Sequence, residues 1–151
     1  MPIPARYVHT NLIARDWRRL AQFYQDVFGC TPVPTERDLS GEWMEKATGL
    51  PGVHLRGVHL RLPGWGDSGP TLEIFSYQPE GPDFKKAIHR FGFGHIAFHV
   101  DDVEEAGAAV VAAGGSRIGQ TVSVPVHGAG TVMFAYMADP EGNAIELQCW
   151  K

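Results

Sequence analysis

Two histidines and two glutamates occupy matching positions in two parts of this 151-residue sequence. His9 and His95 each lie near the start of a short strand-like segment, and Glu73 and Glu146 each stand between aliphatic neighbours in a later one. Two neutral imidazoles and two carboxylates suit a first-row divalent ion with room left for water or substrate. If the four side chains converge, the pattern predicts a catalytic site for Fe, Mn, Co, Ni or Zn.

An internal repeat is the reason to expect convergence. A strand histidine, an aspartate and a glycine recur at one constant spacing of 86 residues (95 − 9, 102 − 16 and 115 − 29). The two sets are His9, Asp16, Gly29 and His95, Asp102, Gly115. A repeat whose copies pack face to face around a pseudo-twofold axis would bring both histidine–glutamate pairs to one place.

Each copy opens with a strand that must position its histidine, followed by a helix. Apolar and other residues alternate along 93–100, which predicts a strand with its histidines on the face opposite its aliphatic groups. Asp16 and Asp102 are predicted N-caps of the two helices. Gly29 and Gly114 are predicted to end them.

The remaining segments complete two modules of one helix and four strands each. Prolines in 31–37 predict an edge strand, and Ser40 is a predicted cap for a short helix that Gly49 ends. A bulge is expected at Gly57. The other expected elements are strands at 53–62, 71–75, 117–124, 131–137 and 144–148, and a short helical piece at 84–90.

The fold class predicted is therefore α+β, with two tandem βαβββ modules in a single domain spanning residues 1–151. Module 1 covers residues 5–78 and module 2 covers residues 91–150, and a linker with prolines and a glycine joins them over 79–90. About a dozen extra residues in the first module are expected within 39–57.

Composition excludes several classes of protein. A net charge of −4 and a pI near 5.9 argue against nucleic acid as a partner, and no apolar run is long enough to cross a bilayer. Cys30 and Cys149 are the two cysteines and have no metal-ligand spacing. We expect a soluble, cytoplasmic protein that acts on a small molecule.

The other histidines are weaker candidates for chemistry. His99 follows His95 by four residues, about 13 Å along a strand, which is too far to share one ion. His54 and His59 could line a pocket and His127 could close over it, but a surface or structural position is favoured for all three.

Four stretches together resemble the vicinal oxygen chelate superfamily, which includes glyoxalase I, methylmalonyl-CoA epimerase, extradiol dioxygenases and bleomycin resistance proteins. These stretches are HTNLIARDWRRLAQFYQDVFG (9–29), TLEIF (71–75), GFGHIAFHVDDVEEA (92–106) and DPEGNAIEL (139–147). The resemblance implies that the two modules form a cupped mixed sheet around one divalent ion. It also implies ligands at His9, Glu73, His95 and Glu146, and a homodimer.

The implied activity is that of a lyase or isomerase that abstracts a proton next to a carbonyl. Glu146 or Glu73 would carry the proton while the ion stabilises enolate charge. A carboxylate at Glu73 resembles the ligand set of bacterial glyoxalase I, whereas the dioxygenases leave that corner open. An iron-dependent dioxygenase and a non-catalytic drug or metabolite binder are the alternatives.

Two departures from bacterial glyoxalase I argue against a glutathione hemithioacetal as substrate. Ile13 stands where that enzyme has an arginine that grips glutathione, and the insert around 43–57 is longer. Arg15, Arg56 or Arg61 could reach an anionic substrate instead.

Overall fold

The computed structural model describes all residues from 1 to 151 and divides into two compact units, Met1–Pro82 and Asp83–Lys151. The first unit contains β1 (His9–Ile13), α1 (Trp17–Phe28), β2 (Thr31–Ser40), α2 (Glu42–Thr48), β3 (His54–Arg61) and β4 (Thr71–Gln78). The second contains β5 (His95–His99), α3 (Val103–Ala112), β6 (Ser116–Arg117), β7 (Val122–Val126), β8 (Gly130–Ala138) and β9 (Ala144–Trp150). The mixed α+β fold is as the sequence predicts.

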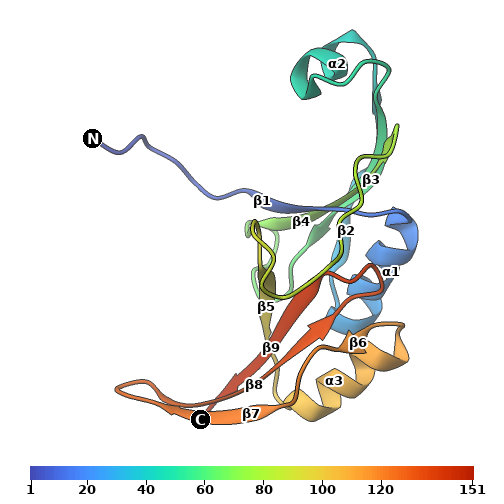
Figure 1. The fold of residues 1–151 in the computed structure, drawn as a ribbon. Coiled ribbons are helices and arrows are strands. Elements are labelled where there is room, and N and C mark those ends of the chain that lie inside the picture. The colour runs from blue at the N-terminus through green and yellow to red at the C-terminus, as the bar shows by residue number, and fades with distance from the viewer. The chain divides into compact units, whose positions relative to one another are not determined.

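The first unit is a four-stranded sheet in the order β1-β4-β3-β2, with α1 against one face (Figure 1). β1 runs parallel to β4, and the other neighbours are antiparallel. The predicted signals bound α1: the Asp16 side chain accepts a hydrogen bond from the Arg19 amide, and Gly29 adopts the left-handed conformation at the other end. β2 is the edge strand, as its prolines indicate.

Alternation along β4 places its apolar core residues on one face of the sheet and Glu73 on the other. Leu72 and Ile74 are fully buried, and β4 packs against α1. Glu73 lies between them in sequence and therefore points to the opposite face of the sheet. A carboxylate that is only 8% exposed on that face needs polar partners there.

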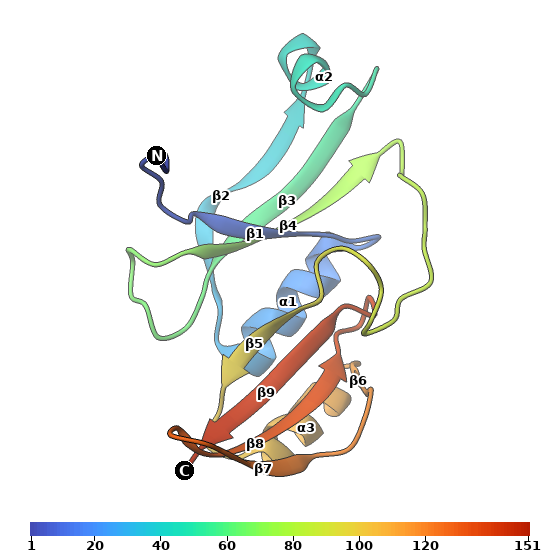
Figure 2. The same cartoon turned by 60° about the vertical axis from the view of Figure 1, so that its left-hand side comes forward.

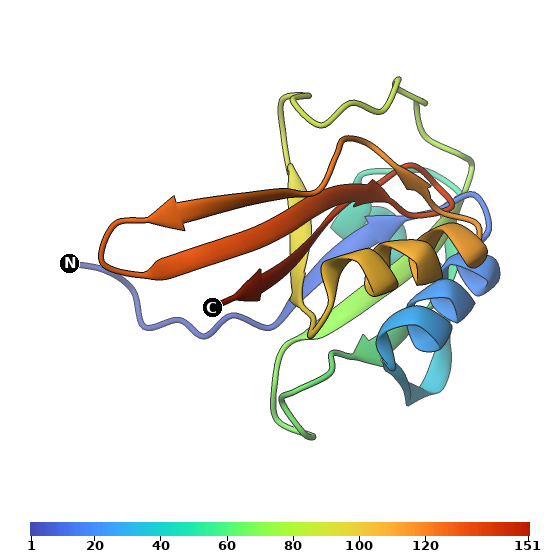
Figure 3. The same cartoon turned by 90° about the horizontal axis from the view of Figure 1, so that it is seen from below.

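The second unit is a sheet in the order β5-β9-β8-β6, with β7 paired to β8 (Figure 2). β5 runs parallel to β9, as β1 does to β4. β7 and β8 form a long hairpin, and α3 lies along one face of this sheet (Figure 3). Asp102 caps α3 by accepting a hydrogen bond from the Glu105 amide, as predicted.

Four local expectations were wrong. The single strand expected at 117–124 is divided into β6 and β7, which lie on either side of residues 118–121. Gly41, with φ of 102°, is the N-cap of α2 where Ser40 was expected, and it offers no side chain to the helix. The irregularity in the sheet lies between Val33 and Arg37 of β2, since β3 pairs with β4 in unbroken register through Gly57. Residues 84–90 contain a turn instead of a helical piece.

None of the helices combines the length and apolar character needed to cross a membrane.

Candidate metal centre

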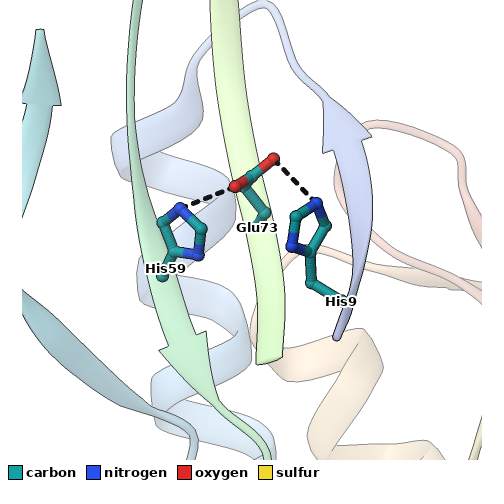
Figure 4. A group of neighbouring side chains, drawn as sticks. All are labelled: His9, His59 and Glu73. Atoms are coloured by element: carbon teal, nitrogen blue, oxygen red, sulfur yellow. Dashed lines mark ion pairs between the residues drawn. The ribbon is translucent and has the colours of Figure 1, made fainter. Parts of the chain in front are cut away.

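Three side chains meet on the face of the first sheet opposite α1. Glu73 lies between His9 and His59 (Figure 4), with His59 Nε2 2.6 Å from Oε2 and His9 Nε2 3.5 Å from Oε1. One potential ligand atom from each residue lies within 4.8 Å of the other two. The group joins three strands, with His9 on β1, Glu73 on β4 and His59 on β3.

Strand register brings these residues together. His59 stands directly opposite Glu73 in the antiparallel β3–β4 pair, so that both side chains lie on one face. Asn11 is the register partner of Glu73 in the parallel β1–β4 pair, and its Nδ2 donates a 2.9 Å hydrogen bond to Glu73 Oε1. His9 precedes Asn11 by two residues and shares its face.

The surroundings of His59 favour its neutral form. Burial is the largest cause of its lowered pKa, and the positive charges of Arg37 and His9 act in the same direction. The charge of Glu73 opposes the shift without reversing it. A neutral imidazole is the form that binds a metal ion, so His59 is prepared for coordination near neutral pH.

The second unit carries a corresponding pair. His95 Nε2 lies 2.9 Å from Glu146 Oε2, and Gln148 Nε2 donates a 3.2 Å hydrogen bond to the other carboxylate oxygen. Trp150 Nε1 in turn donates to Gln148 Oε1 at 2.5 Å. This chain of hydrogen bonds along β9 fixes the orientation of the Glu146 carboxylate.

The residue opposite the glutamate distinguishes the two halves of the repeat. Tyr136 on β8 is the register partner of Glu146, just as His59 on β3 is the register partner of Glu73. The Tyr136 ring makes an edge contact with His95, with ring centroids 5.2 Å apart. The first unit thus offers a third potential metal ligand where the second offers a phenol.

The donor set of the first unit fits a divalent first-row ion. Ligand atoms bound to one ion at about 2.1 Å lie at most about 4.2 Å apart, so small side-chain rotations would bring the three atoms into range. Two imidazoles and one carboxylate match the preference of Zn, Fe, Co and Ni for mixed nitrogen and oxygen ligands. Asn11 would hold the carboxylate from outside the ligand set.

The structure brings His9 beside Glu73 and His95 beside Glu146, two of the pairings that the sequence suggested. His59, which the sequence suggests only as a pocket-lining residue, contacts Glu73, and the sequence does not predict this contact. His54 instead pairs with Asp38, away from this group, and His99 is exposed. The signal that could have found His59 is the alternation of β3, provided that its register with β4 is known.

This chain is similar to known proteins over most of its own length and most of theirs. A lactoylglutathione lyase from Haemophilus influenzae is 32% identical over 140 residues, covering 93% of this chain and 89% of that protein. A probable lactoylglutathione lyase from Vibrio parahaemolyticus is 30% identical over 145 residues, with 94% and 88% covered.

Solved structures show the same fold. A glyoxalase family protein from Bacillus cereus superposes with a TM-score of 0.81 at 16% identity, covering 99% of this chain and 96% of that one. The sequence model of the Glyoxalase/Bleomycin resistance protein/Dioxygenase superfamily matches residues 6–147. This chain therefore belongs to the Glyoxalase/Bleomycin resistance protein/Dioxygenase superfamily.

Proposed function

We propose that this protein is a divalent-metal-dependent lyase or isomerase of the glyoxalase type. The observation that carries the proposal is the buried Glu73 carboxylate held between two histidines on the face of the first sheet opposite α1. The lactoylglutathione lyases among its relatives support a reaction on a small carbonyl compound. Homodimer formation stays a prediction from the family resemblance.

The proposed ligand set is His9, Glu73, His95 and Glu146, one histidine and one glutamate from each copy of the repeat. The matched strand positions and the two histidine–glutamate contacts support this set. His59 is a further potential donor beside Glu73. A bound divalent ion would polarise a substrate carbonyl and thereby acidify the adjacent carbon–hydrogen bond.

The chain's own residues would move the proton. Glu146 is the proposed base, because Gln148 fixes one of its oxygens and its side chain is 17% exposed, which leaves access for a substrate. Glu73, the second candidate, has partners on both oxygens, Asn11 and His59, and Glu146 likewise has Gln148 and His95. The greater exposure of the Glu146 side chain, 17% against 11% for Glu73, therefore favours Glu146 as the base.

The test uses methylglyoxal mixed with glutathione, and with a second thiol, in deuterated water. Incorporation of solvent deuterium at the carbon next to the product carbonyl supports proton transfer, and Glu146→Gln should abolish turnover with the fold retained. Glu105→Gln, an exposed carboxylate on α3, is the matched control. Full activity in Glu146→Gln would refute the assignment of the base.

An iron-dependent dioxygenase is the second candidate, for one specific reason. His9, His59 and Glu73 form a set of two histidines and one carboxylate, the arrangement that non-haem iron oxygenases use. Substrate-dependent oxygen uptake by the iron-loaded protein would favour this reading over proton transfer. Neither oxygen uptake nor deuterium exchange, with retained ligand binding, would indicate a binding protein.

A further inference from the structure

Arg37 differs from the other arginines of this protein in its pairing. Five arginines contact carboxylates: Arg15 with Glu80, Arg18 with Glu36, Arg56 with Asp38, Arg61 with Asp67 and Arg117 with Glu104. Arg6, Arg19 and Arg90 are exposed to solvent. Arg37 is half-buried, and its guanidinium donates one 2.5 Å hydrogen bond to the Thr35 carbonyl without a carboxylate partner.

Strand register places Arg37 on the same face as the candidate metal centre. Arg37 is opposite Gly57 in the β2–β3 pair, and Gly57 is two residues from His59 on β3. Cross-strand partners and residues two apart share a face of a sheet. Arg37 is also one of the positive charges that lower the pKa of His59.

The Phe75 ring lies against Gly57, the register partner of Arg37. A Cβ at position 57 would lie 2.3 Å from the Phe75 ring, so that ring occupies the place where a side chain would stand. The Phe75 and His59 rings are in edge contact, with centroids 6.0 Å apart. The face therefore carries the three-residue group on β1, β4 and β3, the Phe75 ring on β4 against Gly57, and Arg37 on the neighbouring strand β2.

A positive charge beside a cation site is unfavourable unless an anion lies between the two. Coulomb repulsion from Arg37 opposes binding of a divalent ion at His9, His59 and Glu73. A half-buried guanidinium without a carboxylate also loses hydration that its one hydrogen bond to the Thr35 carbonyl replaces only in part. Both costs would be relieved by an anionic ligand that spans the ion and the arginine.

We infer that Arg37 binds a carboxylate of the substrate, and that the substrate is an anionic molecule that presents oxygens at its metal-bound end and this carboxylate at the other. The inference rests on the proposed function, because it places the reacting end of the molecule at the metal centre. Arg37 is proposed for this role in place of Arg15, Arg56 and Arg61, because those three arginines already contact acidic residues. Arg37 is then a specificity-determining residue.

The experiment measures binding instead of turnover. Cobalt-loaded protein is titrated calorimetrically with 2-oxoglutarate and with 2-oxovalerate, which has the same chain length but lacks the second carboxylate. A second pair, 2-oxoadipate and 2-oxohexanoate, allows for a longer reach. One charge-assisted arginine–carboxylate contact predicts that the wild type prefers a dicarboxylate by about 10- to 100-fold.

Arg37→Met should remove this preference, whereas Arg56→Met should retain it. Arg56 is a matched control because it lies on the neighbouring strand in the next register row, paired with Asp38. No preference in the wild type, or a preference that survives in Arg37→Met, would overturn the inference. Failure of the protein to bind cobalt would count against the proposed function instead, and the dicarboxylate preference of the metal-free protein would still report on Arg37.

Discussion

Gly57→Ala is the substitution expected to damage the candidate metal centre most without touching any of its side chains. A Cβ at this position would lie 2.0 Å from the Ile74 carbonyl oxygen and 2.3 Å from the Phe75 ring. The carbonyl belongs to the backbone of β4, so β3 and β4 must move apart to admit the methyl group. Because His59 and Glu73 face each other across these two strands, their 2.6 Å contact should lengthen.

Overpacking of this kind costs about 1–3 kcal/mol. An unfolding entropy of roughly 2.1 cal/mol/K per residue gives about 0.3 kcal/mol/K for a chain of this length. The expected fall in melting temperature is therefore about 3–10 °C, together with weaker metal binding. Differential scanning calorimetry and a metal titration measure the two effects.

Gly81→Ala is the control for Gly57→Ala, because a Cβ at position 81 meets nothing within 4 Å. Its melting temperature should stay the same or rise slightly, since alanine reduces the entropy of the unfolded chain. A Gly57→Ala protein that melts within about 1 °C of the wild type would refute the reasoning, because a real clash must exceed that shift.

Three further outcomes are expected. Burial raises the pKa of Cys30 to about 11, so iodoacetamide at pH 8 should label Cys149 in the folded protein and Cys30 only after unfolding, as mass spectrometry would show. Asp139→Ala should lower the free energy of unfolding by about 1–3 kcal/mol, because the buried carboxylate accepts hydrogen bonds from backbone amides of its turn. Urea unfolding measures this change, and an unchanged midpoint would contradict it. The hydrogen bond from His54 lowers the pKa of Asp38 below 3.8. This contact therefore stabilises the fold above pH 3.8, and the stabilisation is lost as the pH falls through the lowered pKa. The difference in melting temperature between Asp38→Asn and the wild type should shrink over that pH range.

Much of the local structure follows from the sequence because its signals are short-range. The caps Asp16 and Asp102 act within three residues of themselves, and their helices begin where the sequence predicts. The prolines of β2 correctly predict an edge strand, because a proline cannot donate to a neighbouring strand. The repeat predicts that each early histidine pairs with its late glutamate, and the parallel pairing of β1 with β4 and of β5 with β9 brings each pair together.

The contact between His59 and Glu73 could not be predicted in the same way. It depends on the register of β3 against β4, which the intervening turn at 62–70 sets. A slip of one residue would turn His59 to the α1 face and place Leu60 opposite Glu73 instead. The position of Arg37 opposite Gly57 similarly depends on where β2 bulges. The sequence suggested a bulge at Gly57 in β3 instead, so it did not predict this position.

The most direct test of the proposed centre is elemental analysis of the purified protein after incubation with Fe, Mn, Co, Ni or Zn. The wild type should hold about one ion per chain, and His9→Ala and His95→Ala should each lose it, because both histidines belong to the proposed four-residue set. An ion that His95→Ala retains with unchanged affinity would contradict that set and leave His9, His59 and Glu73 as the whole site. No ion in the wild type would contradict a metal centre altogether.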